Sequence, residues 1–245
     1  MKKLTIIFLF LVAFLKSYAQ CPTVVTNNYT VTCAAPCATV TATPTSTLNA
    51  TSAYSVSAIT FAGANYTTGT SVTMGDDAYS DSISLPFCFS FFGNNYTKCL
   101  IGSNGNICFN TTLALGYDPW SISGPLPGSN CNATKNAIMG SWCDMYQSPG
   151  GGITPGTIKY FTSGTAPCRT FVVSWITPMY SCTSLRDTTQ IVLYETTNVI
   201  EVYIKRHNGS CSWNSGRAVT GIENAAGSVY YLSLIHISEP TRPLY

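Results

Sequence analysis

The sequence predicts an all-β protein, an antiparallel β-sandwich that is stapled by disulfides and preceded by a low-complexity N-terminal leader. Two observations carry this prediction. Short, alternating apolar runs recur between turn signals from Tyr54 onward, and no window has the periodicity of an amphipathic helix. In addition, all eleven cysteines follow an N-terminal export signal, and disulfides are the expected state of cysteines in an exported chain.

The two ends of the chain are set apart from the predicted domain. Residues 1–19 have the basic start, apolar stretch and small-residue cleavage site of a signal peptide, and the apolar stretch is too short to span a bilayer. Residues 20–53 are rich in Thr, Ala, Pro and Cys, which is typical of a leader. Residues 232–245 resemble translated sequencing-adapter read-through, so we expect them to make no core contacts. The domain then spans residues 54–231 of a longer parent protein.

Charge excludes one class of function. Of the twelve Lys and Arg residues, four lie in the two ends of the chain, and of the ten Asp and Glu residues, one does. The remainder of the chain therefore has eight basic and nine acidic residues. A nearly neutral domain without a basic patch has no electrostatic basis for binding nucleic acid.

The first predicted hairpins surround a phenylalanine-rich strand. Phe87, Phe89 and Phe91 alternate with Cys88, Ser90 and Phe92, which indicates one buried face. Asn104-Gly105 predicts a tight hairpin turn between Leu100-Ile101 and Ile107-Cys108. A two-residue turn there places Ile101 opposite Cys108. Cys99 and Cys108 then become diagonal neighbours too far apart to bridge, and at least one of them pairs elsewhere, with Cys88 the nearest candidate.

Two further segments are predicted to be core strands. Residues 170–176 are apolar on both faces, which favours a central strand. Residues 190–194 and 199–205 flank a turn at residues 195–198, which indicates a second hairpin. In its second strand, alternation places Ile200, Val202 and Ile204 inward and Glu201, Tyr203 and Lys205 outward.

All eleven cysteines are disulfide candidates: Cys21, Cys33, Cys37, Cys88, Cys99, Cys108, Cys131, Cys143, Cys168, Cys182 and Cys211. Zinc is the alternative ligand of cysteines. Cys33 and Cys37 have a spacing that suits zinc, but no second Cys or His pair follows at a matching interval, so disulfides are favoured over metal.

The order of several motifs resembles the nidogen-like extracellular domain (NIDO), in the version found in large secreted proteins of gliding Bacteroidetes. The matching pieces are Phe91-Phe92-Gly93 with Tyr96, Ser103–Ile107, Ala137–Asp144, Phe171–Trp175, Thr189–Leu193 and Thr220–Asn224. The resemblance implies a secreted, non-catalytic adhesion or interaction module on the bacterial surface. It also implies downstream domains of the same chain, type IX secretion and an extracellular protein or glycan as partner.

Four loop aromatics are candidates for ligand contact, namely Tyr117, Trp120, Tyr146 and Trp213. Loop aromatics can stack on sugar rings or form the centre of a protein interface. The alternative is that they pack over the ends of the sandwich. A glycan-binding module of a secreted enzyme is therefore the second functional hypothesis, and coplanar, exposed aromatics beside amides and carboxylates would distinguish it.

The sequence predicts no catalytic residue and no cofactor. His207, which is the one histidine outside the tail, lies in a polar segment after a predicted strand, so we expect an exposed loop histidine rather than half of a Cys–His pair. Asp76 and Asp77, with Asp81 or Asp144, could bind a structural calcium ion, but their spacing does not match a calcium loop. Turn-capping carboxylates are the favoured interpretation, and Asp118 and Asp187 are also assigned to turns.

Overall fold

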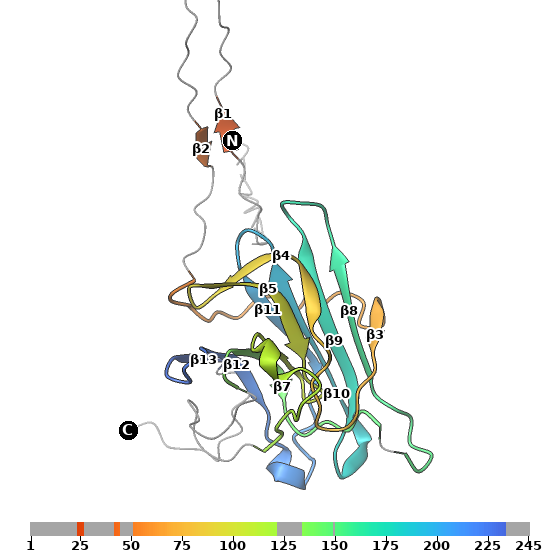
Figure 1. The fold of residues 1–245 in the computed structure, drawn as a ribbon. Helices are drawn as coiled ribbons and strands as arrows, with labels where there is room; N and C mark the ends of the chain where they lie inside the picture. The colour runs from red at the N-terminus through yellow and green to blue at the C-terminus, as the bar shows by residue number, and fades with distance from the viewer. Residues whose placement is uncertain (1–23, 27–41, 45–50, 122–133, 149, 234–245) are drawn as a thin grey trace, which may run out of the picture.

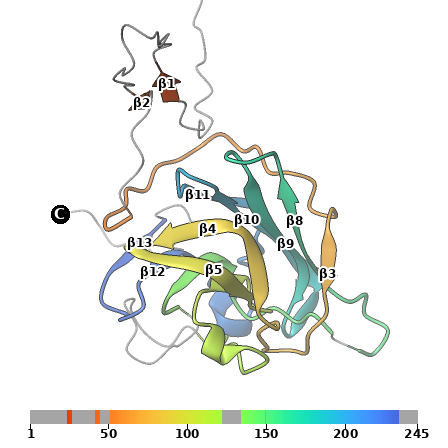
Figure 2. The same cartoon turned by 45° about the horizontal axis from the view of Figure 1, so that its top comes forward.

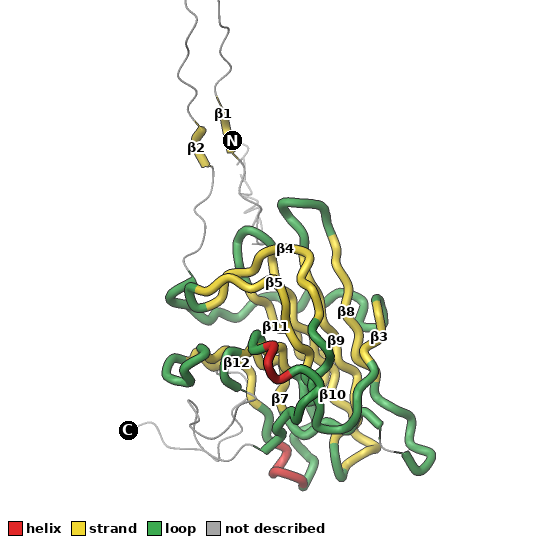
Figure 3. Tube along the Cα trace, in the orientation of Figure 1, coloured by secondary structure: helices red, strands yellow, loops and turns green. Residues whose placement is uncertain are grey.

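The computed structural model describes residues 24–26, 42–44, 51–121, 134–148 and 150–233 (Figure 1). In this part of the chain almost all regular structure is β-strand. The exceptions are two short 3-10 helices, η1 (Thr111–Leu113) and η2 (Trp213–Gly216), which are the red turns in Figure 3. None of the helices in these residues has the length and apolarity needed to cross a membrane.

Two antiparallel sheets pack face to face, which confirms the predicted β-sandwich. The five-stranded sheet has the order β11 (Ile200–Arg206), β10 (Cys182–Tyr194), β9 (Thr170–Met179), β8 (Thr157–Ser163) and β3 (Thr70–Val72). The six-stranded sheet has the order β13 (Tyr230–Leu232), β12 (Val219–Glu223), β7 (Ala137–Trp142), β6 (Asn106–Cys108), β5 (Asn94–Ile101) and β4 (Ile83–Phe91). Figure 2 shows β4 and β5 lying across the layer formed by β8, β9 and β10.

The core lies between the two sheets and follows the predicted alternation of β4. Phe87, Phe89 and Phe91 are buried, whereas Cys88 is exposed. Their rings share one cluster with Trp175 and other side chains of the opposite sheet. Burial of one such side chain stabilises the fold by roughly 1.5–3 kcal/mol, so this strand anchors the sandwich.

The hairpin of β5 and β6 forms at the predicted place, but its register differs by one residue. Leu100, not Ile101, lies opposite Cys108. The reason is the turn, because the Gly102 amide donates to the Asn106 carbonyl at 2.9 Å, which leaves a three-residue loop. Gly105 closes this loop with a φ of +89°, a conformation that suits glycine.

The disulfide prediction is wrong for four cysteines of the described residues. Cys88, Cys99, Cys108 and Cys143 are free thiols. Adjacent residues of a strand face opposite sides, so Cys99 points into the core between the sheets, while Cys108 lies in a separate cluster with Leu100. Cys99 and Cys108 therefore do not bridge, as predicted, but neither pairs with Cys88, which faces outward from β4.

Other cysteines do form disulfides. Cys182 is bonded to Cys211, with 5.8 Å between their Cα atoms, and Cys168 is disulfide-bonded as well. Cys21, Cys33, Cys37 and Cys131 lie outside the described residues.

The second hairpin is confirmed, with one correction. Strands β10 and β11 pair on either side of residues 195–198, and β9 lies inside its sheet between β10 and β8, as predicted. Tyr203 was expected to point into solvent, but it is only 6 % exposed. The irregular segment 54–69 covers it, because the Phe61 ring lies 5.7 Å from the Tyr203 ring and the Tyr66 hydroxyl donates to the Tyr203 carbonyl.

The chain ends show how far the predicted boundaries hold. Strands β1 (Val24–Thr26) and β2 (Ala42–Pro44) of the leader pair with each other and with neither large sheet. Leu232 was assigned to the foreign tail, but it pairs with Gly221 as the last residue of β13. The sheet therefore continues one residue past the expected boundary. The predicted signal peptide, residues 1–19, and residues 234–245 lie outside the described residues.

Candidate functional site

The candidate site is built around the end of β7, where successive side chains point to opposite sides. Ser141 and Cys143 face a buried polar cluster on the opposing sheet, and both hydrogen bond to Asp187. Trp142 and Asp144 face the other way, toward the loops at this end of the sandwich, where the Trp142 indole donates to the Pro119 carbonyl. This period of two lets one short segment organise two neighbouring polar regions.

The first region is the buried cluster of Ser141, Cys143, Asp187 and His207. All three neighbours approach the same carboxylate oxygen, Oδ2 of Asp187. The Ser141 hydroxyl lies at 2.9 Å, the Cys143 sulfur at 3.2 Å and His207 Nδ1 at 2.9 Å. The Asp187 side chain is 0 % exposed and that of His207 only 11 %.

Two predictions are therefore wrong. His207 is not an exposed loop histidine, and Asp187 lies within β10 rather than in a turn. The physical reason is the pairing of β10 with β11. Thr188 lies opposite Arg206 after a bulge, so the next residues, Asp187 and His207, meet across the hairpin. Extending the predicted hairpin register backward from residues 190–194 places Asp187 opposite Arg206, one residue short of His207, because the pattern of the sequence does not reveal the bulge.

The protonation state of His207 follows from the hydrogen-bond acceptors around its ring. His207 Nε2 lies 2.9 Å from the Gly216 carbonyl, and Nδ1 lies 2.9 and 3.1 Å from the two Asp187 oxygens. Both ring nitrogens face acceptors, so both carry protons. The hydrogen bond with Asp187 accordingly raises the pKa of His207, against the opposing effect of burial. Burial also raises the pKa of the Cys143 thiol well above its usual value.

The second region contains Asp77, Asp118 and Asp144 around Asn104. The Asn104 amide group donates to Asp77 Oδ1 and to the Asp118 carbonyl, each at 3.0 Å, and its backbone N–H donates to Asp118 Oδ2 at 3.0 Å. Burial raises the pKa of both Asp118 and Asp144 to about 7. Asp118 was assigned to a surface turn, but it is 0 % exposed.

Asp76, Asp77, Asp81 and Asp144 are the acids considered as calcium ligands. Asp76 and Asp77 interact electrostatically with Asp144, whose pKa they raise further. Asp81 instead accepts a hydrogen bond from the Ser82 amide at 2.6 Å, which is the turn-capping role expected for these acids. The fold thus groups Asp144 with the first two acids.

The third feature is an aromatic row formed by Trp120, Trp213, Tyr180 and Tyr146. Successive ring centroids are 5.6, 5.0 and 5.3 Å apart, and the ring planes are inclined by 42–54°. Each side chain is partly exposed. The row joins three of the four aromatics singled out in the sequence. Tyr180 was missed because it follows directly on an apolar strand.

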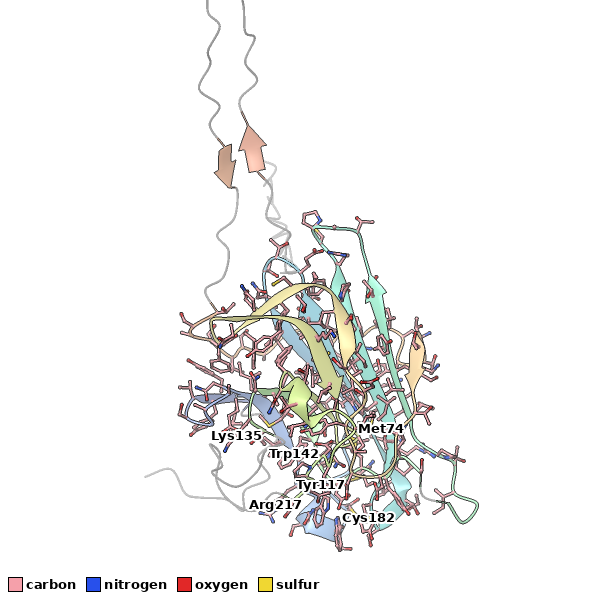
Figure 4. All side chains as sticks on the ribbon, viewed as in Figure 1. Met74, Tyr117, Lys135, Trp142, Cys182 and Arg217 are labelled. Atoms are coloured by element: carbon pink, nitrogen blue, oxygen red, sulfur yellow. A yellow bond between two sulfur atoms is a disulfide. The ribbon has the colours of Figure 1, made fainter. Side chains whose placement is uncertain are left out.

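The aromatic row is held by two fixed points. The Trp213 indole donates to Asp144 Oδ2 at 2.6 Å. The Cys182–Cys211 disulfide fastens the turn after Tyr180 to the loop before Trp213. Tyr117, the fourth predicted aromatic, is not in the row but is 62 % exposed in the loop that leads to Trp120. Figure 4 shows Tyr117, Cys182 and Arg217 at the same end of the sandwich.

A groove on another face was not predicted. It has a cavity volume of about 520 Å³ and lies between residues 61–67 and strands β10 and β11. Its lining combines Phe61 and Tyr66 with the cations Arg186, Lys205 and Arg206. Residues 61–67 lack strand periodicity, so no pattern in the sequence placed them beside these cations.

The fold and this site define a class, that of disulfide-stapled, antiparallel β-sandwich modules whose loops are gathered at one end. The family described as NIDO related matches residues 49–242. The chain therefore belongs to the NIDO-related family, and this domain is an extracellular module. Neither a curated protein nor a solved structure matches the chain.

Proposed function

We propose that this chain is a secreted, non-catalytic adhesion module that binds another extracellular protein. The proposal includes its place as the N-terminal part of a larger bacterial surface protein exported by type IX secretion. Membership of the NIDO-related family and the signal-like N-terminus support an extracellular setting. The contact surface is the loop 115–120 together with the aromatic row.

The observation that carries the proposal is the exposure of two apolar side chains on a fixed loop. Leu115 is 75 % exposed and Tyr117 is 62 % exposed, which makes them the most exposed large apolar side chains of the described residues. Leu115 also has a φ of +60°. This conformation is costly for a branched side chain, and such strain concentrates at functional sites.

The backbone of this loop is held from several sides. The Leu115 amide donates to the Ser80 carbonyl at 3.2 Å, and the Gly116 carbonyl accepts from the Tyr79 amide at 2.9 Å. Further along, the Asp118 amide donates to the Asp77 carbonyl at 2.8 Å. A loop that is ordered before binding loses little entropy in the complex, so its apolar side chains contribute more fully to affinity.

The aromatic row favours a protein partner over a sugar. Its rings are inclined to one another by 42–54° and are only partly exposed, so they form no flat stacking platform. Inclined aromatics beside exposed apolar residues are typical of the centre of a protein interface. A glycan-binding module of a secreted enzyme is the competing hypothesis that the experiment below addresses.

The absence of catalysis is part of the proposal, and the His207 geometry supports it. A general base needs a free lone pair, but both nitrogens of His207 face acceptors. Cys143 bonds to Asp187 rather than to His207, and burial keeps it protonated. A nucleophile–base pair would need the opposite arrangement.

Binding of the purified chain to immobilised panels of extracellular proteins and of glycans tests the proposal. The double variant Leu115→Ser/Tyr117→Ala should bind its protein ligand at least about 30-fold more weakly, the loss expected for removing a hot spot. The matched control is Val56→Ala/Ile59→Ala, which removes apolar side chains that are 55 % and 47 % exposed on another segment. Glycan binding that survives in the loop variant would contradict the proposal.

A further inference from the structure

Four potential ligand atoms converge in the buried cluster described above. They are the Ser141 hydroxyl, the Cys143 sulfur, Oδ2 of Asp187 and Nδ1 of His207. The ligand atoms of Cys143, Asp187 and His207 all lie within 4.8 Å of one another. Ser141 closes the set, because its hydroxyl is 2.9 Å from Asp187 Oδ2 and 3.4 Å from His207 Nδ1, and it interacts with the Cys143 thiol.

We propose that these four side chains form a structural zinc site that ties the two sheets together. Ser141 and Cys143 come from the end of β7 in the six-stranded sheet. Asp187 lies in β10 of the five-stranded sheet, and His207 directly follows β11. An ion bound here replaces hydrogen bonds between the sheets by coordinate bonds.

The separations suit a tetrahedral ion. Ligands at the usual zinc distances lie about 3.4–3.6 Å apart at the corners of a tetrahedron. The observed separations from Asp187 Oδ2 are 2.9 Å to His207 Nδ1 and 3.2 Å to the Cys143 sulfur. These two separations need to open by only about half an ångström or less to accept the ion, and the ligand atoms of Cys143, Asp187 and His207 all lie within 4.8 Å of one another.

Neighbouring groups already orient the ligands as in a zinc site. A ligating histidine usually donates its second N–H to a carbonyl, and His207 Nε2 does so to Gly216 at 2.9 Å. That carbonyl belongs to a glycine with a φ of +62°, where an added Cβ would lie 2.2 Å from the Gly209 oxygen. The other Asp187 oxygen accepts from the Asn208 amide at 3.3 Å, which leaves Oδ2 for the ion.

The exchange of protons for zinc leaves the charge of the buried cluster unchanged. Without metal the cluster holds one carboxylate, one imidazolium and one neutral thiol. Zinc binding releases the Cys143 thiol proton and the Nδ1 proton of His207 to solvent, so a dication then faces one thiolate and one carboxylate. Both states are neutral overall, which favours the burial of these side chains.

The ligand types select the ion. Thiolate, imidazole and carboxylate are the protein ligands that zinc takes, and zinc in structural sites is almost always four-coordinate. Calcium and magnesium prefer six or more oxygen ligands, which this cluster does not offer. The role is structural because protein side chains fill all four positions and no position remains for a substrate.

Metal analysis of the full chain, expressed with zinc and dialysed, tests the site. We expect about one zinc ion per chain. Cobalt substituted for zinc should give a thiolate-to-cobalt charge-transfer absorption. Removing zinc from the unaltered protein with a chelator should lower the Tm, and adding zinc back should restore it, so this arm depends on no variant.

The matched pair of variants is Cys143→Ser and Cys99→Ser, because both thiols are free and buried. Zinc affinity should fall at least about 100-fold in Cys143→Ser, and the thiolate-to-cobalt charge-transfer band should vanish. Cys99→Ser should keep both the zinc affinity and the charge-transfer band. Zinc content near zero in the unaltered chain, a Tm that the chelator does not change, or equal zinc affinity in the two variants would overturn the proposal.

Discussion

Asp118 and Asp187 are both 0 % exposed, yet the protein compensates their burial in different ways. Asp187 faces an imidazolium, with His207 Nδ1 at 2.9 Å. Asp118 receives only neutral donors, among them the Asn104 amide at 3.0 Å and Asn106 Nδ2 at 3.2 Å. In a chain with few charges, oriented amides therefore take the place of a cation beside a buried carboxyl group. Because neutral donors stabilise the carboxylate less than a cation does, burial raises the pKa of Asp118 to about 7.

The largest effect is expected from removing the cation beside Asp187. The variant His207→Ala leaves a buried carboxylate without its counter-charge, which should cost about 3–5 kcal/mol of unfolding free energy. At this chain length the Tm should fall by roughly 10 °C, as measured by calorimetry of the metal-free protein. The double variant His207→Gln/Asp187→Asn should recover part of the loss, and additive losses would show that the two groups are not coupled.

A smaller loss is expected on the Asp118 side. The variant Asn104→Ala removes the amide that donates to Asp77 and to the Asp118 carbonyl and accepts from the Met145 amide at 2.9 Å. Chemical denaturation should show a loss of about 2–3 kcal/mol. Asn95→Ala, at an exposed asparagine, serves as the control and should change stability by less than about 0.5 kcal/mol. Equal losses in Asn104→Ala and Asn95→Ala would show that the Asn104 side chain does not stabilise the region around Asp118.

The raised pKa of Asp118 predicts that stability depends on pH. The folded-state pKa of Asp118 is raised from 3.8 to about 7, so the folded protein binds more protons than the unfolded chain between these values. Stability should therefore fall as the pH rises through this window, and be greatest at its acid end. The variant Asp118→Asn should flatten this slope in Tm measurements over the same window. An unchanged slope would mean that Asp118 does not titrate there.

The smallest of these effects is expected for Tyr79→Phe. The Tyr79 hydroxyl hydrogen bonds to Asp118 and favours its charged form. Losing it should cost about 1 kcal/mol and steepen the fall in stability with rising pH, because the carboxylate is less well solvated. Tyr96→Phe is the matched control, since that hydroxyl donates to Asn136 Oδ1 at 3.0 Å and touches no acid. It should lower stability without changing the slope.

The sequence was sufficient for the fold because the fold follows from local patterns. Alternation in Phe87–Phe91 and the turn signal at Asn104-Gly105 depend on neighbours a few residues away, and both were confirmed. The single-residue register error arose because Asn-Gly allows both two- and three-residue loops. Periodicity alone does not separate these turns.

The site was less predictable because its members are distant in sequence. Asp187 and His207 meet only through a bulge in their hairpin, and Cys143 reaches them from the other sheet. The sequence placed Trp120, Tyr146 and Trp213 outside the strands, and the fold brings all three into one row. What the sequence could not supply was Tyr180, which joins Tyr146 to Trp213.

The Cys182–Cys211 disulfide has a mechanical consequence for this extracellular module. Its two cysteines are 29 positions apart and enclose β10 and β11. When a pulling force extends the chain, this segment stays closed and withholds roughly 100 Å of contour length. The oxidised domain therefore reaches a shorter extended length than the reduced one. The redox state of its surroundings therefore sets how far the domain extends under force.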